Sequence, residues 1–322
     1  HLVRFNERIR IAGSLVEDEP LAALLGEVLD ASDRIEPSFF EVTTAAAFLA
    51  FARTPADACV VEVGLGGRLD ATNVVEHVLV CGIASLGVDH QQFLGRTLAE
   101  IAAEKAGIAK PGVPLVALAA PAEAEAVIER VAQERGAPAY VEGRDWALDP
   151  ALRPPLAGAH QLSNANLAWQ MLARQGRLPV RRSEFVDGLA SAQWPARFHR
   201  LAPGPLTGGI ETWLDGAHNL AAAKALAAVL SERGPMHVVL GILANKDADG
   251  IVGALAPNAL SLTFVPVPDH DHRDPAELAQ RFGGRSAANL EGALAGLPAP
   301  RLIAGSLYLA GQALAANREP PG

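Results

Sequence analysis

Short apolar runs without polar alternation recur along the first half of the chain. Three of them, at 58–64, 78–87 and 114–120, contain β-branched residues and predict strands. Segments with helical character lie before and between them, at 41–53 and 97–108. Fully apolar strands that are joined by helices are typical of a parallel sheet covered on both faces. The pattern therefore predicts an α/β fold built on a parallel sheet.

A second alternation of strands and helices follows. Its predicted strands lie at 210–219, 236–242, 262–267 and 300–306, and its helices at 219–233, 246–255, 275–282, 288–297 and 307–316. Residues 197–209 carry two prolines and three glycines, which is typical of an interdomain connection. We therefore expect two domains, 1–196 and 197–322, and a frayed tail from Asn317 onward.

Composition restricts what the chain can bind. Of its 322 residues, 50% are hydrophobic and 20% are charged, as in a globular protein with ample core. The net charge of −9 argues against broad binding to nucleic acid or to anionic membranes. No apolar run reaches the ~20 residues of a membrane span. Cys59 and Cys81 lie in apolar runs and are expected to be buried in a reducing compartment, so we expect a cytoplasmic protein.

Candidate chemistry begins in residues 62–73, which combine two carboxylates, three glycines and an arginine. Glu62 ends one predicted strand and His90 follows the next, so both reach the sheet edge where doubly wound folds bind ligands. Mg²⁺ with phosphate would explain Glu62 well but His90 less well, because imidazole is an unusual magnesium ligand. The alternatives are a solvated carboxylate and a capping or core histidine. A dinucleotide site is a weak interpretation, because the third glycine of G-x-G-x-x-G is missing.

Further polar residues have both a structural and a functional interpretation. Lys105 falls in the last turn of the predicted helix 97–108, where a cation complements the helix C-terminus. Asp215, His218 and Asn219 stand where a strand ends and a helix begins, and could simply form an N-cap cluster. Arg197 could be an ordinary surface residue.

Taken together, these stretches resemble the bifunctional dihydrofolate synthase/folylpolyglutamate synthase family, within the Mur ligase superfamily. The resemblance covers essentially the whole chain and rests on HLVRFNERIRI, FFEVTTAAAF, EVGLGGRLDATNVV, GVDHQQFLGRTLAEIAAEKAGIAKPG, HQLSNANLA, WPARF, LDGAHN, GILANKDADGI and AGSLYLAG. It implies a Mur-ligase-like fold, with a parallel-sheet ATPase-type domain over 1–196 and a smaller Rossmann-like domain over 197–322.

The resemblance also implies an activity, that of an ATP-dependent amide ligase. ATP would phosphorylate a carboxylate of dihydropteroate or of a tetrahydrofolate, and the amine of L-glutamate would attack the acyl phosphate. Two Mg²⁺ sites and a monovalent cation are the implied ions, and the enzyme is expected to be a monomer.

The family's functional positions carry over onto named residues. Those that match metal ligands are Glu62, His90 and Lys105. Lys105 is expected to be a carbamate, which forms on a neutral amine and turns a cation into an anion. The positions that match ATP contacts are Asn164, Arg197 and Asp215, with His218 as an active-site neighbour. Those that match the pteroate site are Ser38, Leu69, Asp70 and Ala71. For Asp70 the alternative is a cap on the turn that leads to Thr72.

The sequence also departs from the family pattern. The family carries a phosphate loop, G-T-N-G-K-G-S, followed by T-S-P-H, and His1 resembles the last residue of that second motif. No G-x-x-x-x-G-K-[ST] motif occurs in the 322 residues. We therefore expect an N-terminally truncated chain that needs the missing loop for activity. Ala196 stands where the family usually has glycine.

Two other functions stay open on the sequence. One is a non-catalytic, folate-binding descendant of the ligase. The retained Glu62, His90 and Lys105 argue against it. The other is a sister ligase for cell-wall precursors. The stretches GGRLDATN and HLVRFNERIR favour folate.

Overall fold

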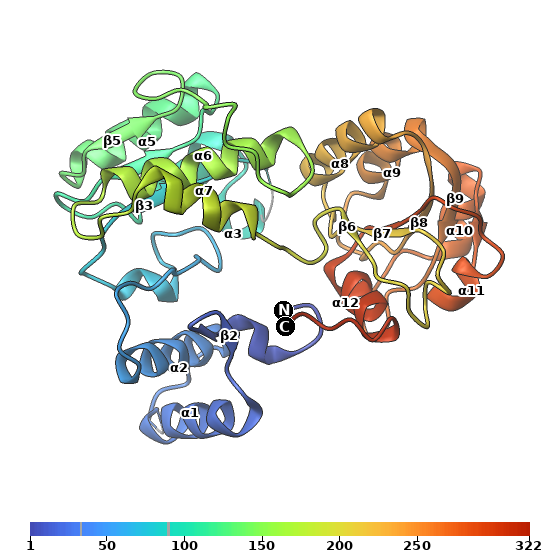
Figure 1. Ribbon diagram of the computed structural model, residues 1–322, viewed down its shortest axis with the longest axis horizontal. Helices are drawn as coiled ribbons and strands as arrows, with labels where there is room; N and C mark the ends of the chain where they lie inside the picture. Colours follow the sequence, from blue (N-terminus) through green and yellow to red (C-terminus); the bar gives the residue numbers. More distant parts are fainter. Residues whose placement is uncertain (33, 89–90) are drawn as a thin grey trace. The chain divides into compact units, whose positions relative to one another are not determined.

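The structure is a computed structural model that describes residues 1–32, 34–88 and 91–322 (Figure 1). It divides into two compact units. The N-terminal unit comprises Ile9–Pro155 and Ala159–Ser191, and the C-terminal unit comprises His1–Arg8, Leu156–Gly158 and Ala192–Gly322. Both ends of the chain therefore belong to the C-terminal unit, where they lie close together (Figure 1).

The first residues of the chain differ from the domain prediction. The predicted boundary after residue 196 lies close to the change of unit at Ala192, but His1–Arg8 does not belong with the domain that follows it. Leu2 and Val3 pack against the core of the C-terminal unit, and the backbone of Leu2 fits closely against Gly311. Burial of these two side chains accounts for the difference, because a sequence pattern does not show which core a short apolar stretch joins.

A three-stranded parallel sheet lies at the centre of the N-terminal unit, in the order β3-β4-β5. Its strands are β3 (Cys81–Ile83), β4 (Leu115–Ala117) and β5 (Ala139–Val141). Leu115 and Ala117 pack with α4 (Leu98–Ala106) and α5 (Ala122–Glu134), while Val116 packs with α6 (Ala159–Arg174) on the other face. The predicted parallel sheet with helices on both faces is thus confirmed.

The remaining elements of this unit precede or follow the sheet. They are β1 (Arg10–Ile11), β2 (Ser14–Leu15), α1 (Asp18–Ala31), α2 (Phe39–Arg53), η2 (Ala71–Val74), α3 (Gln91–Leu94) and α7 (Arg182–Ala190). A 3₁₀ turn, η1 (Phe5–Arg8), lies in the C-terminal unit.

The predicted buried strand at 58–64 is wrong. These residues form no strand, Val60 is 96% exposed, and Cys59 is exposed rather than buried. The sheet of this unit ends at β3, and no described strand pairs with the segment. A run of β-branched residues becomes a buried strand only where a neighbour supplies hydrogen-bond partners and a covering face. Glu62 consequently stands on an extended, exposed stretch and not at the end of a strand.

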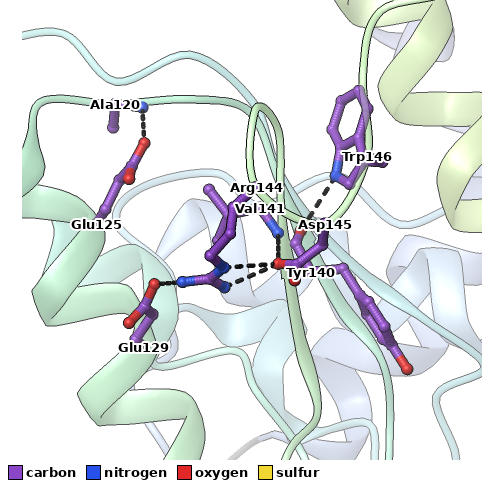
Figure 2. A network of polar contacts seen from close by, with 8 residues as sticks. All are labelled: Ala120, Glu125, Glu129, Tyr140, Val141, Arg144, Asp145 and Trp146. Carbon is purple, nitrogen blue, oxygen red and sulfur yellow. Dashed lines mark hydrogen bonds and ion pairs between the residues drawn. The ribbon is translucent and has the colours of Figure 1, made fainter.

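Polar contacts close the carboxyl end of β5 (Figure 2). The guanidinium of Arg144 binds Glu129 on α5 and the carboxylate of Asp145, which also accepts the Val141 N–H at 2.8 Å. The hydrogen bond from Arg144 holds the pKa of Asp145 below its usual value. Trp146 donates its indole N–H to the Tyr140 carbonyl. The polar groups that follow β5 are therefore paired with one another and with α5.

The C-terminal unit contains a six-stranded sheet in the order β10-β9-β8-β11-β7-β6, parallel except for β6. Its strands are β6 (His199–Arg200), β7 (Thr212–Leu214), β8 (Met236–Leu240), β9 (Ala259–Phe264), β10 (Arg285–Ser286) and β11 (Arg301–Ala304). The four strands predicted for this half of the chain correspond to β7, β8, β9 and β11, and the two-residue strands β6 and β10 are additional.

Helices cover both faces of this sheet. Val238 and Leu240 pack with α8 (Leu220–Arg233), α9 (Ala248–Leu255) and α10 (Pro275–Phe282). Val239 faces the opposite side and packs with α11 (Leu290–Leu294) and α12 (Leu307–Ala316). A short 3₁₀ turn, η3 (Ala256–Asn258), precedes β9. Among the described helices, none is both long and apolar enough to cross a bilayer.

The Pro/Gly-rich stretch and the tail are both more ordered than their composition suggests. Asn317 is buried, donates to the Ala202 carbonyl at 2.9 Å and accepts the Thr207 N–H at 3.3 Å. Glu319 accepts the Ala202 N–H at 2.9 Å and pairs with His199 at 3.2 Å. The prediction of a frayed tail is therefore wrong for Asn317 and Glu319, whose side chains satisfy backbone groups of Ala202 and Thr207. Residues 197–209 lie within the C-terminal unit, which begins at Ala192, and not between the two units.

Candidate active site

The glycine-rich loop that follows Glu62 packs onto the C-terminal end of α4. Gly67 has a φ of +152°, and a Cβ built there would lie 2.8 Å from Ile108 Cγ2 and 2.9 Å from the Glu104 carbonyl oxygen. Contacts that short leave no room for a side chain. The backbone of Gly67 therefore packs directly against the end of α4, and this packing explains the glycine without a bound ligand.

Hydrogen bonds fasten the same loop to the helix. The Arg68 N–H donates to the Glu104 carbonyl at 2.8 Å, and its guanidinium pairs with the Glu104 carboxylate at 2.9 Å. The Asn73 amide donates to the Arg68 and Gly107 carbonyls. Lys110 in turn donates to the Asn73 carbonyl at 2.8 Å. Carbonyls at the end of α4 that have no partner within the helix are satisfied in this way.

Asp70 organises the loop from within. One carboxylate oxygen accepts the N–H groups of Gly64 at 3.1 Å and Leu65 at 2.8 Å. The other accepts the Thr72 N–H at 3.0 Å and its hydroxyl at 2.6 Å, which caps η2. Asp70 is 9% exposed, so these four bonds account for most of its capacity. They support the turn-capping interpretation, and a pteroate contact from this carboxylate stays a prediction.

The other predicted pteroate residues come from two elements that are in contact. Ser38 is the N-cap of α2, and its hydroxyl forms a capping box with Glu41. The ring of Phe40, in the first turn of α2, lies where a Cβ on Gly64 would be. Leu69 is 78% exposed beside η2, which contacts α2. The structure therefore brings Ser38 and the 69–71 turn to one side of the N-terminal unit.

The predicted metal ligands do not form a site in the part of the chain that the structure describes. His90 lies outside the described residues. Glu62 is exposed, and Lys105 is half-buried on α4. No group of three or more His, Cys, Asp or Glu side chains suited to a metal ion occurs among the described residues. Metal binding and the Lys105 carbamate thus stay predictions.

Asn164 lies on α6 with its side chain exposed and its amide bonded to Gln161 at 3.2 Å. Its neighbour Asn166 is fully buried and binds the backbone of Asp149. The two asparagines therefore differ in kind. Asn166 is structural, whereas Asn164 is exposed and its contact with ATP stays a prediction.

In the C-terminal unit, Asp215 joins the WPARF segment to the loop after β7. Its carboxylate accepts the Phe198 N–H at 2.7 Å and the Ala217 N–H at 2.8 Å. The Gly216 N–H donates to the Ala196 carbonyl at 2.8 Å. The structure thus brings Arg197 and Asp215 together, as the sequence predicts for two residues that serve one ligand.

Burial of Asp215 raises the pKa of its carboxyl group, and the two backbone hydrogen bonds and the charge of Arg197 oppose that rise. His218 and Asn219 complete the loop. His218 Nδ1 lies 2.9 Å from the Gly216 carbonyl, and Asn219 caps α8 through the Ala222 N–H. The N-cap interpretation therefore holds for Asn219, while the ring of His218 is fixed by the backbone next to Asp215.

Positive φ angles at Ala196 (+59°) and Phe198 (+45°) are the feature that sequence patterns miss. Residues other than glycine seldom adopt this region, and for a bulky residue it is an outlier. One signal was present, because the family usually has glycine where this chain has Ala196.

Replacement of Ala196 by glycine should be nearly neutral. Relief of the left-handed backbone gains about 1–2 kcal/mol, and loss of a buried methyl group costs about 1 kcal/mol. Ala223, also 0% exposed but in the first turn of α8, is the matched control. Ala223→Gly should lower the free energy of unfolding in urea by about 2 kcal/mol. Equal losses in the two variants would contradict this account of Ala196.

Comparisons with known proteins bear on these residues. No family model matches the sequence. A dihydrofolate synthase/folylpolyglutamate synthase from Bacillus subtilis (strain 168) is 33% identical over 298 residues, which cover 82% of this chain and 68% of the relative. The folylpolyglutamate synthase of Lacticaseibacillus casei is 31% identical over 347 residues, covering 96% of this chain and 80% of the relative. The chain belongs to the dihydrofolate synthase/folylpolyglutamate synthase family.

Solved structures of this family agree in fold. A folylpolyglutamate synthase from Mycobacterium tuberculosis, complexed with ADP and AMPPCP, has a TM-score of 0.88 at 29% identity. That match covers 100% of this chain and 84% of the other. The Mur-ligase-like prediction is thereby confirmed. The chain spans only 44% of the human mitochondrial folylpolyglutamate synthase, to which it is 37% identical.

Proposed function

We propose that this protein is an ATP-dependent amide ligase that adds L-glutamate to 7,8-dihydropteroate and to tetrahydrofolates. The observation that carries the proposal is the similarity to the Bacillus subtilis and Lacticaseibacillus casei enzymes over most of the chain. Structures of E. coli FolC with DHPP and ADP, and of a bifunctional folylpolyglutamate synthase/dihydrofolate synthase with Mn, AMPPNP and L-glutamate, support the substrate classes. We further propose that the protein works as a monomer in the cytoplasm.

The proposal gives roles to residues of both units. Those assigned to ATP are Asn164, Arg197 and Asp215, with His218 at the reacting groups. Those assigned to the pteroate are Ser38 at the N-cap of α2 and, on the 64–73 loop, Leu69, Asp70 and Ala71. Those assigned to the divalent metal, proposed to be Mg²⁺ at two sites, are Glu62, His90 and carbamylated Lys105. The metal would offset the charge of the phosphates when bound.

Among the assigned residues, Arg197 has the role that the geometry supports best, which is to bind the nucleotide through its guanidinium. A guanidinium is always charged and can bind a phosphate or a ribose oxygen with two parallel N–H groups. The Asp215 carboxylate accepts the Phe198 N–H and the Gly216 N–H donates to the Ala196 carbonyl, so the backbone is held on both sides of Arg197. No residue of the 322 is assigned to a phosphate loop, because the motif is not in the sequence.

The test is transfer of labelled L-glutamate. We fuse the chain to a phosphate-loop segment of the family pattern and supply ATP, Mg²⁺ and either dihydropteroate or a monoglutamyl tetrahydrofolate. We expect ATP-dependent product with both acceptors, and far less from the 322 residues alone. In the fusion, Arg197→Met should raise the KM for ATP by at least about tenfold, a loss of about 1.4 kcal/mol, and leave the KM for dihydropteroate unchanged.

Two results would overturn the proposal. A fusion that binds dihydropteroate but forms no product would indicate the non-catalytic descendant. Product formed only with a cell-wall precursor would indicate the sister ligase.

A further inference from the structure

The segment that carries Arg197 is held in an unfavourable backbone conformation. Ala196 and Phe198, on either side of it, both have positive φ angles. A phenylalanine adopts such a conformation only when its surroundings impose it. The carboxylate of Asp215 and the N–H of Gly216 supply the backbone restraint already described.

A stack of side chains supplies a second, separate restraint. The ring of Phe198 lies parallel to Trp213 on β7, with 4.6 Å between centroids and 18° between planes. The guanidinium carbon of Arg233 lies 5.1 Å from the Trp213 centroid and 5.7 Å from the Phe198 centroid. Trp213 is itself fixed by an indole hydrogen bond to Glu211 at 2.9 Å. A cation within ~6 Å of an aromatic face is attracted to it.

We propose that Trp213 and Arg233 are positioning residues for Arg197. They hold the Phe198 ring, and the ring keeps the strained backbone of residues 196–198 in place, so that Arg197 is ordered before a nucleotide binds. Pre-ordering of this kind raises affinity because less conformational freedom is lost on binding. The inference rests on the proposed function only for the identity of the ligand that Arg197 binds. The stack of Phe198, Trp213 and Arg233 is observed independently of it.

The plain alternative is that Arg233 only complements the C-terminus of α8, where it lies in the last turn. Arg281 provides the matched control. It lies in the last turn of α10, its guanidinium is 5.4 Å from the Phe282 centroid, and it pairs with Asp249. Arg281→Met therefore removes a last-turn cation and a cation–ring contact in the same unit, at a place that does not touch residues 196–198.

The experiment measures amide hydrogen exchange by NMR in the 322-residue chain and in Arg233→Met and Arg281→Met. Exchange at the N–H groups of Phe198 and Gly216 should become at least about tenfold faster in Arg233→Met and stay unchanged in Arg281→Met. Trp213→Leu should act as Arg233→Met does. Unchanged exchange at both groups in Arg233→Met, or the same acceleration in Arg281→Met, would overturn the positioning role.

A titration with ADP, followed by chemical shifts, separates this inference from the proposed function. We expect Arg197→Met and Arg233→Met each to weaken ADP binding, and the double variant to bind no more weakly than Arg197→Met alone. If Arg197→Met binds ADP as tightly as the parent does, Arg197 does not contact the nucleotide, and the stack of Phe198, Trp213 and Arg233 cannot raise the affinity for ADP through Arg197. Additive losses in the double variant would show that Arg233 acts apart from Arg197, which would overturn the inference.

Discussion

Replacement of Asp215 by alanine is expected to lower the free energy of unfolding by about 3 kcal/mol, because it leaves two buried N–H groups without an acceptor. These groups belong to Phe198 and Ala217, and the first of them sits on a strained backbone. Part of the loss is offset, since a buried carboxylate no longer has to be desolvated. Urea denaturation of the variant measures the difference.

Asp247 offers a matched control for Asp215. Its carboxylate also accepts a backbone N–H, from Gly250 at 2.9 Å, but it caps α9 on the exposed surface. Asp247→Ala should cost about 1 kcal/mol, as is usual for an N-cap. If the two variants lose the same amount, Asp215 is no more than a surface cap.

Replacement of Gly67 by alanine should also cost about 3 kcal/mol, from a close contact and an unfavourable φ together. The new Cβ would meet the carbonyl oxygens of Glu104 and Lys105 at 2.9 and 3.1 Å, and neither can move without distorting α4. We therefore expect the 64–73 loop to lift from the helix and pteroate binding to fall with it. Thermal unfolding and a dihydropteroate titration report the two effects.

The cost of a positive φ alone can be measured at Gly136, in the same unit. It has a φ of +68°, and no described atom lies within 4 Å of a Cβ built there. Gly136→Ala should cost about 1 kcal/mol and leave dihydropteroate binding unchanged. An equal loss at Gly67 would mean that the close approach to α4 contributes nothing.

Local signals in the sequence predict local structure well. Thr97 and Glu100 form a capping box at the start of α4, and that helix, Leu98–Ala106, falls within the predicted range 97–108. The apolar runs around Cys81 and Leu115 become paired strands, because each finds a parallel neighbour in the same unit. Where a signal and the partner it needs are both present, sequence reasoning succeeds.

The sequence-based predictions are wrong where a segment's structure depends on a partner that is distant in the sequence or missing. Val60 and Val61 have the composition of a buried strand, yet they are exposed because no described strand pairs with them. Asn317 and Glu319 have the composition of a loose tail, yet they are ordered by the backbone of Ala202. Neither result can be read from a window of sequence, since the partner of Ala202 lies more than a hundred residues away.

The candidate site shows the same division. The structure places Arg197 and Asp215 on adjoining segments, and the first turn of α2, which Ser38 caps, packs against the loop that carries Leu69, while the ligands of these residues stay predictions. The sequence does not show that the carboxylate of Asp70 is occupied by its own loop, because a carboxylate that binds a substrate and one that caps a turn look alike in a sequence.

The ordered end of the chain has a practical consequence for anyone who handles the protein. The side chains of Asn317 and Glu319 bind the loop at 202–207, so α12 and that loop are fastened by the last few residues. A stop codon or a protease cut ahead of Asn317 would leave the Thr207 N–H without its acceptor. An affinity tag is therefore best joined beyond Glu319, and a purified sample should be checked by mass spectrometry for the presence of residues 317–319.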